Sequence, residues 1–218
     1  MKKVLAILGI LLLLFVGYVW FFYFRGRMNR HEGPQPVPIA VSKHSDQFNN
    51  SVDNVLNVYY KMTEGFVNWD TTTVNKYAAE LRIALDSIKT NELKKDTAKD
   101  ADKIYLTAAD FISYSKNEAG NILQQATLDK KREALNSLAD NLRNVLITVK
   151  YDKGKVYYQE CPMAFNEDTP GYWLSPTEKV RNPYLGTMHP KYHSAMLECG
   201  KPKDSIDFMV QDTVIKHN

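Results

Sequence analysis

The sequence predicts a mainly α-helical protein: an antiparallel four-helix bundle, preceded by one transmembrane helix and followed by an irregular, loop-rich C-terminal segment. Three observations predict this fold. Residues 4–24 carry no charge, residues 46–150 repeat apolar side chains at three- and four-residue steps, and six of the nine prolines follow position 160. We therefore divide the chain into five parts: a membrane anchor (1–30), a proline-containing spacer (31–45), the bundle (46–150), the C-terminal segment (151–210) and a tail (211–218).

The uncharged run at residues 4–24 is long enough to cross a membrane, because a helix of that length spans roughly 30 Å. A cleaved signal peptide is the alternative, but the run is too long and lacks a small-x-small cleavage site. Basic residues flank both ends, so the positive-inside rule does not decide the orientation. The short N-terminus favours a single-pass protein of the inner (cytoplasmic) membrane with its soluble domain in the periplasm.

The bundle is predicted from four apolar stripes. The first contains Phe48, Val52, Val55, Tyr59, Met62 and Phe66. Three more stripes follow within residues 74–88, 101–122 and 128–149, and we expect residues 91–96 to form a loop. Asp70 or Thr71 and then Thr127 are candidate N-caps for the second and fourth helices. Short connections between amphipathic helices favour an antiparallel bundle.

The charge of the chain is small and dispersed, with a net value of +3. There is no basic stripe with interleaved aromatic residues, so we expect no nucleic-acid partner. Charged residues of the bundle such as Glu80, Lys130, Lys131 and Arg132 alternate in sign, which is typical of a solvated helix face.

The C-terminal segment concentrates soft donor atoms. The candidate metal ligands are two thiols, three thioethers and two imidazoles: Cys161, Met163, Met188, His189, His193, Met196 and Cys199. Sulfur donors favour Cu(I), and imidazole is an acceptable companion. A Cys161–Cys199 disulfide explains the two cysteines equally well, because it would close a loop of about 40 residues and stabilise it by roughly 3–4 kcal/mol. We expect the remaining polar and aromatic positions to be structural, with Trp173 and Tyr184 covering the end of the bundle and a turn at Asn182.

At these residues the sequence resembles the bacterial family known as domain of unknown function 3347. Four ordered blocks carry the resemblance: Cys161-Pro162-Met163-Ala164, Trp173-Leu174-Ser175, Asn182-Pro183-Tyr184-Leu185-Gly186 and Met196-Leu197-Glu198-Cys199-Gly200. The resemblance covers residues 48–206. It implies an exported helical bundle, found alone or fused to adaptor subunits of heavy-metal efflux pumps, and so it points to Cu(I) or Ag(I). The chain departs from the family pattern in the inserted residues 187–195, which either enrich a metal site or form an exposed loop.

Two functions follow as hypotheses. The first is a membrane-anchored periplasmic module that binds copper or silver and delivers it to an efflux system. The alternative is a disulfide-stapled domain that binds another envelope protein and no metal. An enzyme is not expected, because Cys161 with His189 or His193 lacks an orienting third residue and an oxyanion site.

Overall fold

The computed structural model describes Phe15, Tyr18, and residues 44–95 and 100–209. Apart from Phe15, Tyr18, His44 and Ser45, the predicted anchor and spacer lie outside the described residues, as does the predicted tail. No helix in this described part combines the length and the apolar character that a membrane span requires. The chain divides into two units, Met1–Ala40 and Val41–Asn218, and the fold below is that of the second unit.

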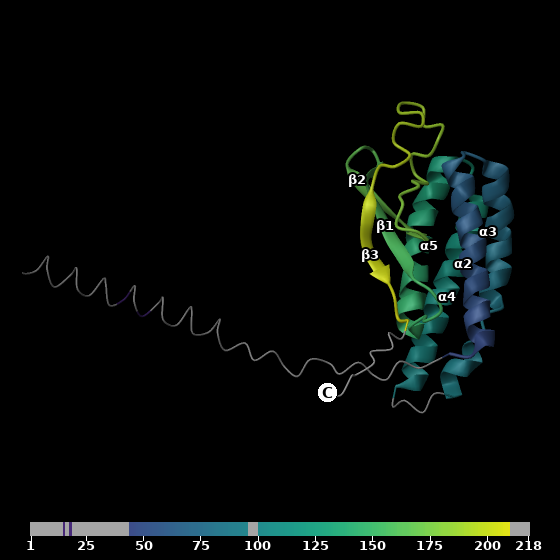
Figure 1. The fold of residues 1–218 in the computed structure, drawn as a ribbon. Coiled ribbons are helices and arrows are strands. Elements are labelled where there is room, and N and C mark those ends of the chain that lie inside the picture. Colours follow the sequence, from purple (N-terminus) through teal and green to yellow (C-terminus); the bar gives the residue numbers. More distant parts are fainter. Residues whose placement is uncertain (1–14, 16–17, 19–43, 96–99, 210–218) are drawn as a thin grey trace, which may run out of the picture. The chain divides into compact units, whose positions relative to one another are not determined.

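The second unit is mainly helical, as the sequence predicts. Its four long helices and one short 3-10 helix are α2 (Asp46–Val67), α3 (Thr71–Asp86), η1 (Thr90–Lys95), α4 (Ala101–Gln124) and α5 (Leu128–Val149). Helix α3 packs against both α2 and α4, and α4 also packs against α5 (Figure 1). The expected loop at residues 91–96 is partly wrong, because η1 occupies most of it and buries Leu93.

The predicted stripes form the core of the helices. All six side chains of the first stripe are buried, and the third stripe extends to the buried Ile122. Three helices begin at a side-chain cap: Ser45 accepts from the Phe48 N–H, Asp70 from the Thr73 N–H and Thr127 from the Lys130 N–H. The prediction of Asp70 and Thr127 as N-caps is confirmed.

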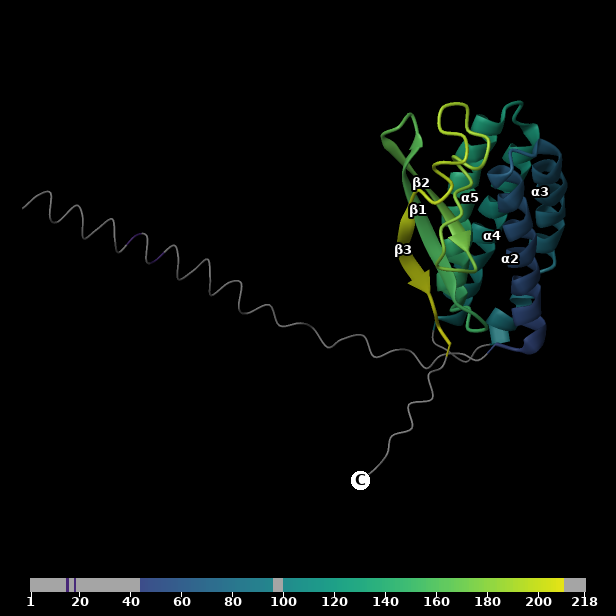
Figure 2. The same ribbon diagram turned by 45° about the horizontal axis from the view of Figure 1, so that its top comes forward.

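The C-terminal segment is more regular than the sequence suggests. It contains a three-stranded antiparallel sheet of order β2-β1-β3, formed by β1 (Val156–Phe165), β2 (Thr169–Ser175) and β3 (Lys201–Ile206). The sheet lies along the α5 side of the helices (Figures 1 and 2). The expectation of an irregular segment is therefore wrong for these strands and holds only for the connection between β2 and β3.

The prolines that suggested loops occupy positions where a strand tolerates them. Pro170 and Pro202 lie on the edge strands β2 and β3. Pro162 lies on the central strand, but beyond the last β1–β3 pair and within the register shift between Cys161 and Phe165. A proline removes one N–H donor, and at edges and bulges this costs little.

Helix side chains protect the outer edge of β2. The Tyr172 N–H donates to Asn136 Oδ1 (2.7 Å), and the Leu174 N–H donates to the Tyr59 hydroxyl oxygen (3.2 Å). Asn136 belongs to α5 and Tyr59 to α2. These contacts satisfy donors that an exposed edge would leave open to another strand. Helices and sheet consequently share one core, which includes the buried Trp173.

Candidate functional site

The structure brings the two cysteines together. Cys161 lies on the central strand β1 and is completely buried, whereas Cys199 lies in the segment before β3 and is half-buried. Both are free thiols, and Cys199 lies close enough to Cys161 to help raise the pKa of the Cys161 thiol. Two sulfur atoms that are 38 positions apart in the numbering therefore form one dithiol site.

The strand pairing explains how the sulfurs meet. The last β1–β3 pair is Glu160 with Lys201, so Cys161 and Cys199 leave the two strands side by side. Gly200 joins Cys199 to the first residue of β3 and has a φ of +134°. A Cβ at Gly200 would lie 2.5 Å from the Glu160 carbonyl oxygen, so only glycine allows this close approach.

Asn182 connects the two cysteine-bearing segments. Its side chain is completely buried; Nδ2 donates to the Cys199 carbonyl oxygen (2.8 Å) and also contacts the Cys161 thiol. Its Oδ1 accepts the Tyr184 N–H (2.8 Å) and the Leu185 N–H (3.1 Å). The sequence indicated only a turn at Asn182, and the single clue to more was its place in one of the four blocks that carry the family resemblance.

Burial dominates the electrostatics of the buried thiol. It raises the pKa of Cys161 to about 11, against the opposing effect of hydrogen bonds from Asn182 and from the Met163 N–H. The Cys161 thiol is therefore protonated at neutral pH. A metal ion that binds it as thiolate must displace that proton.

The three methionines occupy different environments. Met163 and Met196 are partly buried and pack against the core next to the dithiol in the chain. The Met163 N–H contacts the Cys161 sulfur, and the Met196 carbonyl oxygen accepts the Cys199 N–H (3.0 Å). Met188, by contrast, is 64% exposed on the inserted loop. The thioethers nearest in the chain to the dithiol are thus those of Met163 and Met196.

The two histidines form a separate feature on the inserted loop. The His193 N–H donates to the His189 carbonyl oxygen (2.8 Å), and the His189 ring stacks on Tyr192 and meets Trp69 edge-on. His189 Nδ1 accepts the Lys191 N–H (3.2 Å) and the Tyr192 N–H (3.3 Å). In neutral His189 the proton therefore lies on Nε2, and a metal bound at Nε2 would disrupt both hydrogen bonds.

No group of three or more Cys, His, Asp or Glu side chains among the described residues is arranged to hold a metal ion. The structure thus pairs Cys161 with Cys199 and adds neither His189 nor His193 to that pair.

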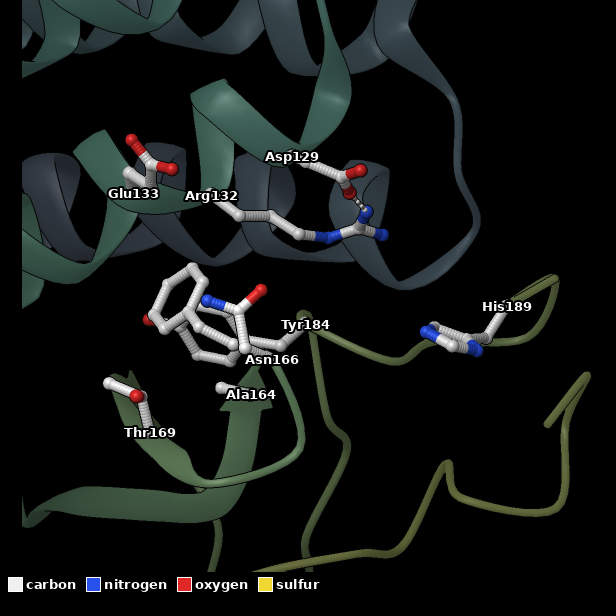
Figure 3. A pocket seen from close by; sticks show the side chains of 9 residues that line it. Asp129, Arg132, Glu133, Ala164, Asn166, Thr169, Tyr184 and His189 are labelled. Atoms are coloured by element: carbon white, nitrogen blue, oxygen red, sulfur yellow. Dashed lines mark hydrogen bonds and ion pairs between the residues drawn. The ribbon is translucent and has the colours of Figure 1, made fainter. Parts of the chain in front are cut away.

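A pocket of about 440 Å³ lies between α5, the β1–β2 turn and the segment that contains Tyr184. In Figure 3 Arg132 and Asp129 line one side, Asn166 and Thr169 the other, and His189 one end. Asp129 and Glu133 oppose the positive charge of Arg132 in this pocket, so the pocket does not have the charge of an anion site.

The expectation that Lys131 and Arg132 face solvent is wrong, since both are 2% exposed. Arg132 Nε donates to the Pro183 carbonyl oxygen (3.0 Å), and Arg132 Nη1 donates to Asp129 Oδ1 (2.9 Å). Burial lowers the pKa of Arg132 to about 10. Lys131 Nζ donates to Asn75 Oδ1 (2.9 Å) and to the Ile122 carbonyl oxygen near the end of α4. Both side chains donate to backbone carbonyl groups of other segments, and helix periodicity does not predict such contacts.

Comparison of the chain with family models, with curated proteins and with solved structures gave no match. The resemblance to domain of unknown function 3347 stays a prediction.

Proposed function

We propose that this chain is a membrane-anchored periplasmic module that binds Cu(I) or Ag(I) through the thiolates of Cys161 and Cys199. The observation that carries the proposal is the proximity of the two free thiols, which the β1–β3 pairing brings together. Two adjacent soft donors suit a soft monovalent cation, and they match no preference of Mg²⁺ or Ca²⁺.

The thioethers of Met163 and Met196 are the additional ligands in this proposal. Both methionines are partly buried next to the cysteines in the chain. Met188, His189 and His193 have auxiliary roles at most, because the first is exposed and the hydrogen bonds of His189 compete with coordination. Their contribution is testable by the variants Met188→Leu and His193→Ala.

Cu(I) competition tests the proposal. The full chain, purified in mild detergent and reduced, is titrated with Cu(I) in the presence of a chromogenic Cu(I) chelator. We expect withdrawal of one Cu(I) per chain, its loss in Cys161→Ser and in Cys199→Ser, and its retention in Met188→Leu. Absence of competition by the reduced wild-type chain overturns the proposal.

Anchoring and delivery are the remaining parts of the proposal. They rest on the uncharged run at residues 4–24 and on the resemblance to domains fused to efflux adaptor subunits. A reporter enzyme that folds only in the periplasm, fused after Asn218, is expected to be active. An inactive reporter, with the fusion present in the membrane fraction, contradicts the orientation.

A second function, a disulfide-stapled domain that binds another envelope protein, is favoured by one observation. Cys161 is completely buried, and burial raises its pKa, which suits an inert structural sulfur more than an exchanging ligand. Intact mass after alkylation in denaturant discriminates the two functions. A chain isolated without reductant that gains two alkyl groups, or gains them after mild reduction of the folded state, favours metal binding. A Cys161–Cys199 disulfide that survives mild reduction of the folded chain favours the disulfide-stapled domain.

A further inference from the structure

We propose that Asn182 is the positioning residue that holds the two thiols together so that one soft ion or metalloid can bridge them. The inference rests on the proposed dithiol function and adds to it the residue that creates the site. In the sequence Asn182 is only a turn marker; in the structure it lies between the two cysteines.

Every hydrogen-bonding position of the Asn182 side chain is used. An amide side chain offers two donor hydrogens on nitrogen and two acceptor sites on oxygen. Oδ1 accepts two backbone N–H groups, those of Tyr184 and Leu185, and Nδ2 faces the Cys199 carbonyl oxygen and the Cys161 sulfur. The two N–H donors on one side fix the orientation of the amide, so the NH₂ group must point towards the cysteines.

The backbone of Asn182 fixes the same segments. Its N–H donates to the Leu197 carbonyl oxygen (2.9 Å), and its carbonyl oxygen accepts the Gly186 N–H (3.0 Å). Asn182 therefore binds the 197–199 segment twice, once through its backbone and once through its side chain. Without the side chain, Cys199 keeps one attachment to this turn and loses the contact that aligns it with Cys161.

Asn182→Asp separates positioning from general stability. An aspartate keeps an oxygen for the Tyr184 and Leu185 N–H groups but replaces the NH₂ donor by a second oxygen, which faces the Cys199 carbonyl oxygen. Asn182→Ala removes both the acceptor oxygen and the NH₂ donor of the side chain. Asn136→Ala is the matched control, because Asn136 Oδ1 also accepts a backbone N–H, that of Tyr172, in the same part of the fold.

Phenylarsine oxide is a probe of thiol proximity that is independent of copper. It forms two As–S bonds to a thiol pair, and the arsenic-bound oxygen leaves as water with the two thiol protons, without a change of oxidation state. We expect the reduced full chain to bind it 1:1, and Asn182→Asp and Asn182→Ala to bind it about 10-fold more weakly, the loss that about 1.4 kcal/mol of hydrogen bonding produces. Asn136→Ala is expected to bind phenylarsine oxide like the wild type.

The outcomes separate the two proposals. Unchanged arsenical binding in folded Asn182 variants overturns the positioning role. Arsenical binding that depends on Asn182 in a chain that does not compete for Cu(I) keeps the positioning role and overturns the metal function.

If the Asn182 variants do not fold, the wild-type chain supplies the test. We expect the Asn182 side-chain NH₂ resonances to exchange slowly with solvent and to shift on arsenical binding. Fast exchange with no shift overturns the proposal.

Discussion

The guanidinium carbon of Arg132 lies 4.1 Å from the centroid of the Trp69 ring. Trp69 has a φ of +57° in the turn between α2 and α3, and its Nε1–H donates to the Leu185 carbonyl oxygen (3.0 Å). Arg132 lies one turn after the start of α5, and its Nε donates to the Pro183 carbonyl oxygen. These two side chains therefore attach the segment that follows Asn182 to the α2–α3 turn and to α5.

We expect Arg132→Lys to lower the free energy of unfolding by about 2–4 kcal/mol. An ammonium group cannot replace the planar fork that contacts the carbonyl oxygens of Pro183 and Phe66 and the Asp129 carboxylate. Urea unfolding of the full chain in detergent measures the change. Arg82→Lys, at an exposed position on α3, is the control and should stay within about 0.5 kcal/mol of the wild type. Equal stability of both variants would show that the Arg132 contacts are not stabilising.

Gly186→Ala tests the other end of the same turn. Gly186 has a φ of +60°, and a Cβ there would lie 2.8 Å from Trp69 Nε1 and closer still to the Val67 carbonyl oxygen. We expect a loss of about 2 kcal/mol or more, because strain and overlap add. The matched control is Gly154→Ala, where the added Cβ would meet the Tyr151 hydroxyl at 3.6 Å, an ordinary contact. A thermal unfolding midpoint equal to that of the control would contradict the prediction.

The helical part of the fold could be predicted from the sequence because it depends on local periodicity. Phe48 to Phe66 bury one face of α2, as the spacing indicates. The sheet was missed because Pro162, Pro170 and Pro202 mask its strands, and their positions at edges and a bulge depend on pairing partners far away in the chain.

The site was predictable only as a set of donor atoms. The concentration of thiols and thioethers within residues 161–199 indicated sulfur ligands, but which of them meet depends on the β1–β3 register and on Gly200. Asn182 and Arg132 were missed for one physical reason. Their roles are hydrogen bonds to backbone carbonyl groups of Cys199, Pro183 and Phe66, and a sequence shows side chains but not which carbonyls they will face.

We expect Tyr59→Phe to lower the free energy of unfolding by about 1–2 kcal/mol. The Tyr59 hydroxyl oxygen accepts the Leu174 N–H at the buried outer edge of β2, and phenylalanine leaves that donor unpaired with little change of shape. Tyr114→Phe is the control, because Tyr114 is 52% exposed on α4. Amide hydrogen exchange at Leu174 should accelerate in Tyr59→Phe only. Unchanged protection at Leu174 would show that the hydroxyl does not hold this edge.

Asp70→Asn is expected to remove part of the acid sensitivity of the fold. The Asp70 side chain caps α3 by accepting the Thr73 N–H (3.1 Å), and the Thr73 hydroxyl also donates to it, so the pKa of Asp70 lies below its usual value. A lowered folded-state pKa means that the carboxylate stabilises the fold fully above the unfolded pKa of about 3.9 and loses this effect as the pH falls through the folded value. Asparagine caps a helix about as well but does not titrate.

The difference in unfolding free energy between wild type and Asp70→Asn should therefore be constant above about pH 5 and shift in favour of the variant at lower pH. Urea unfolding at a series of pH values measures this difference. Asp110→Asn, at an exposed position within α4, is the control that removes one carboxylate without removing a cap. Because both variants change the net charge equally, a pH dependence shared by the two would assign the effect to overall charge. One confined to Asp70→Asn assigns it to the α3 cap.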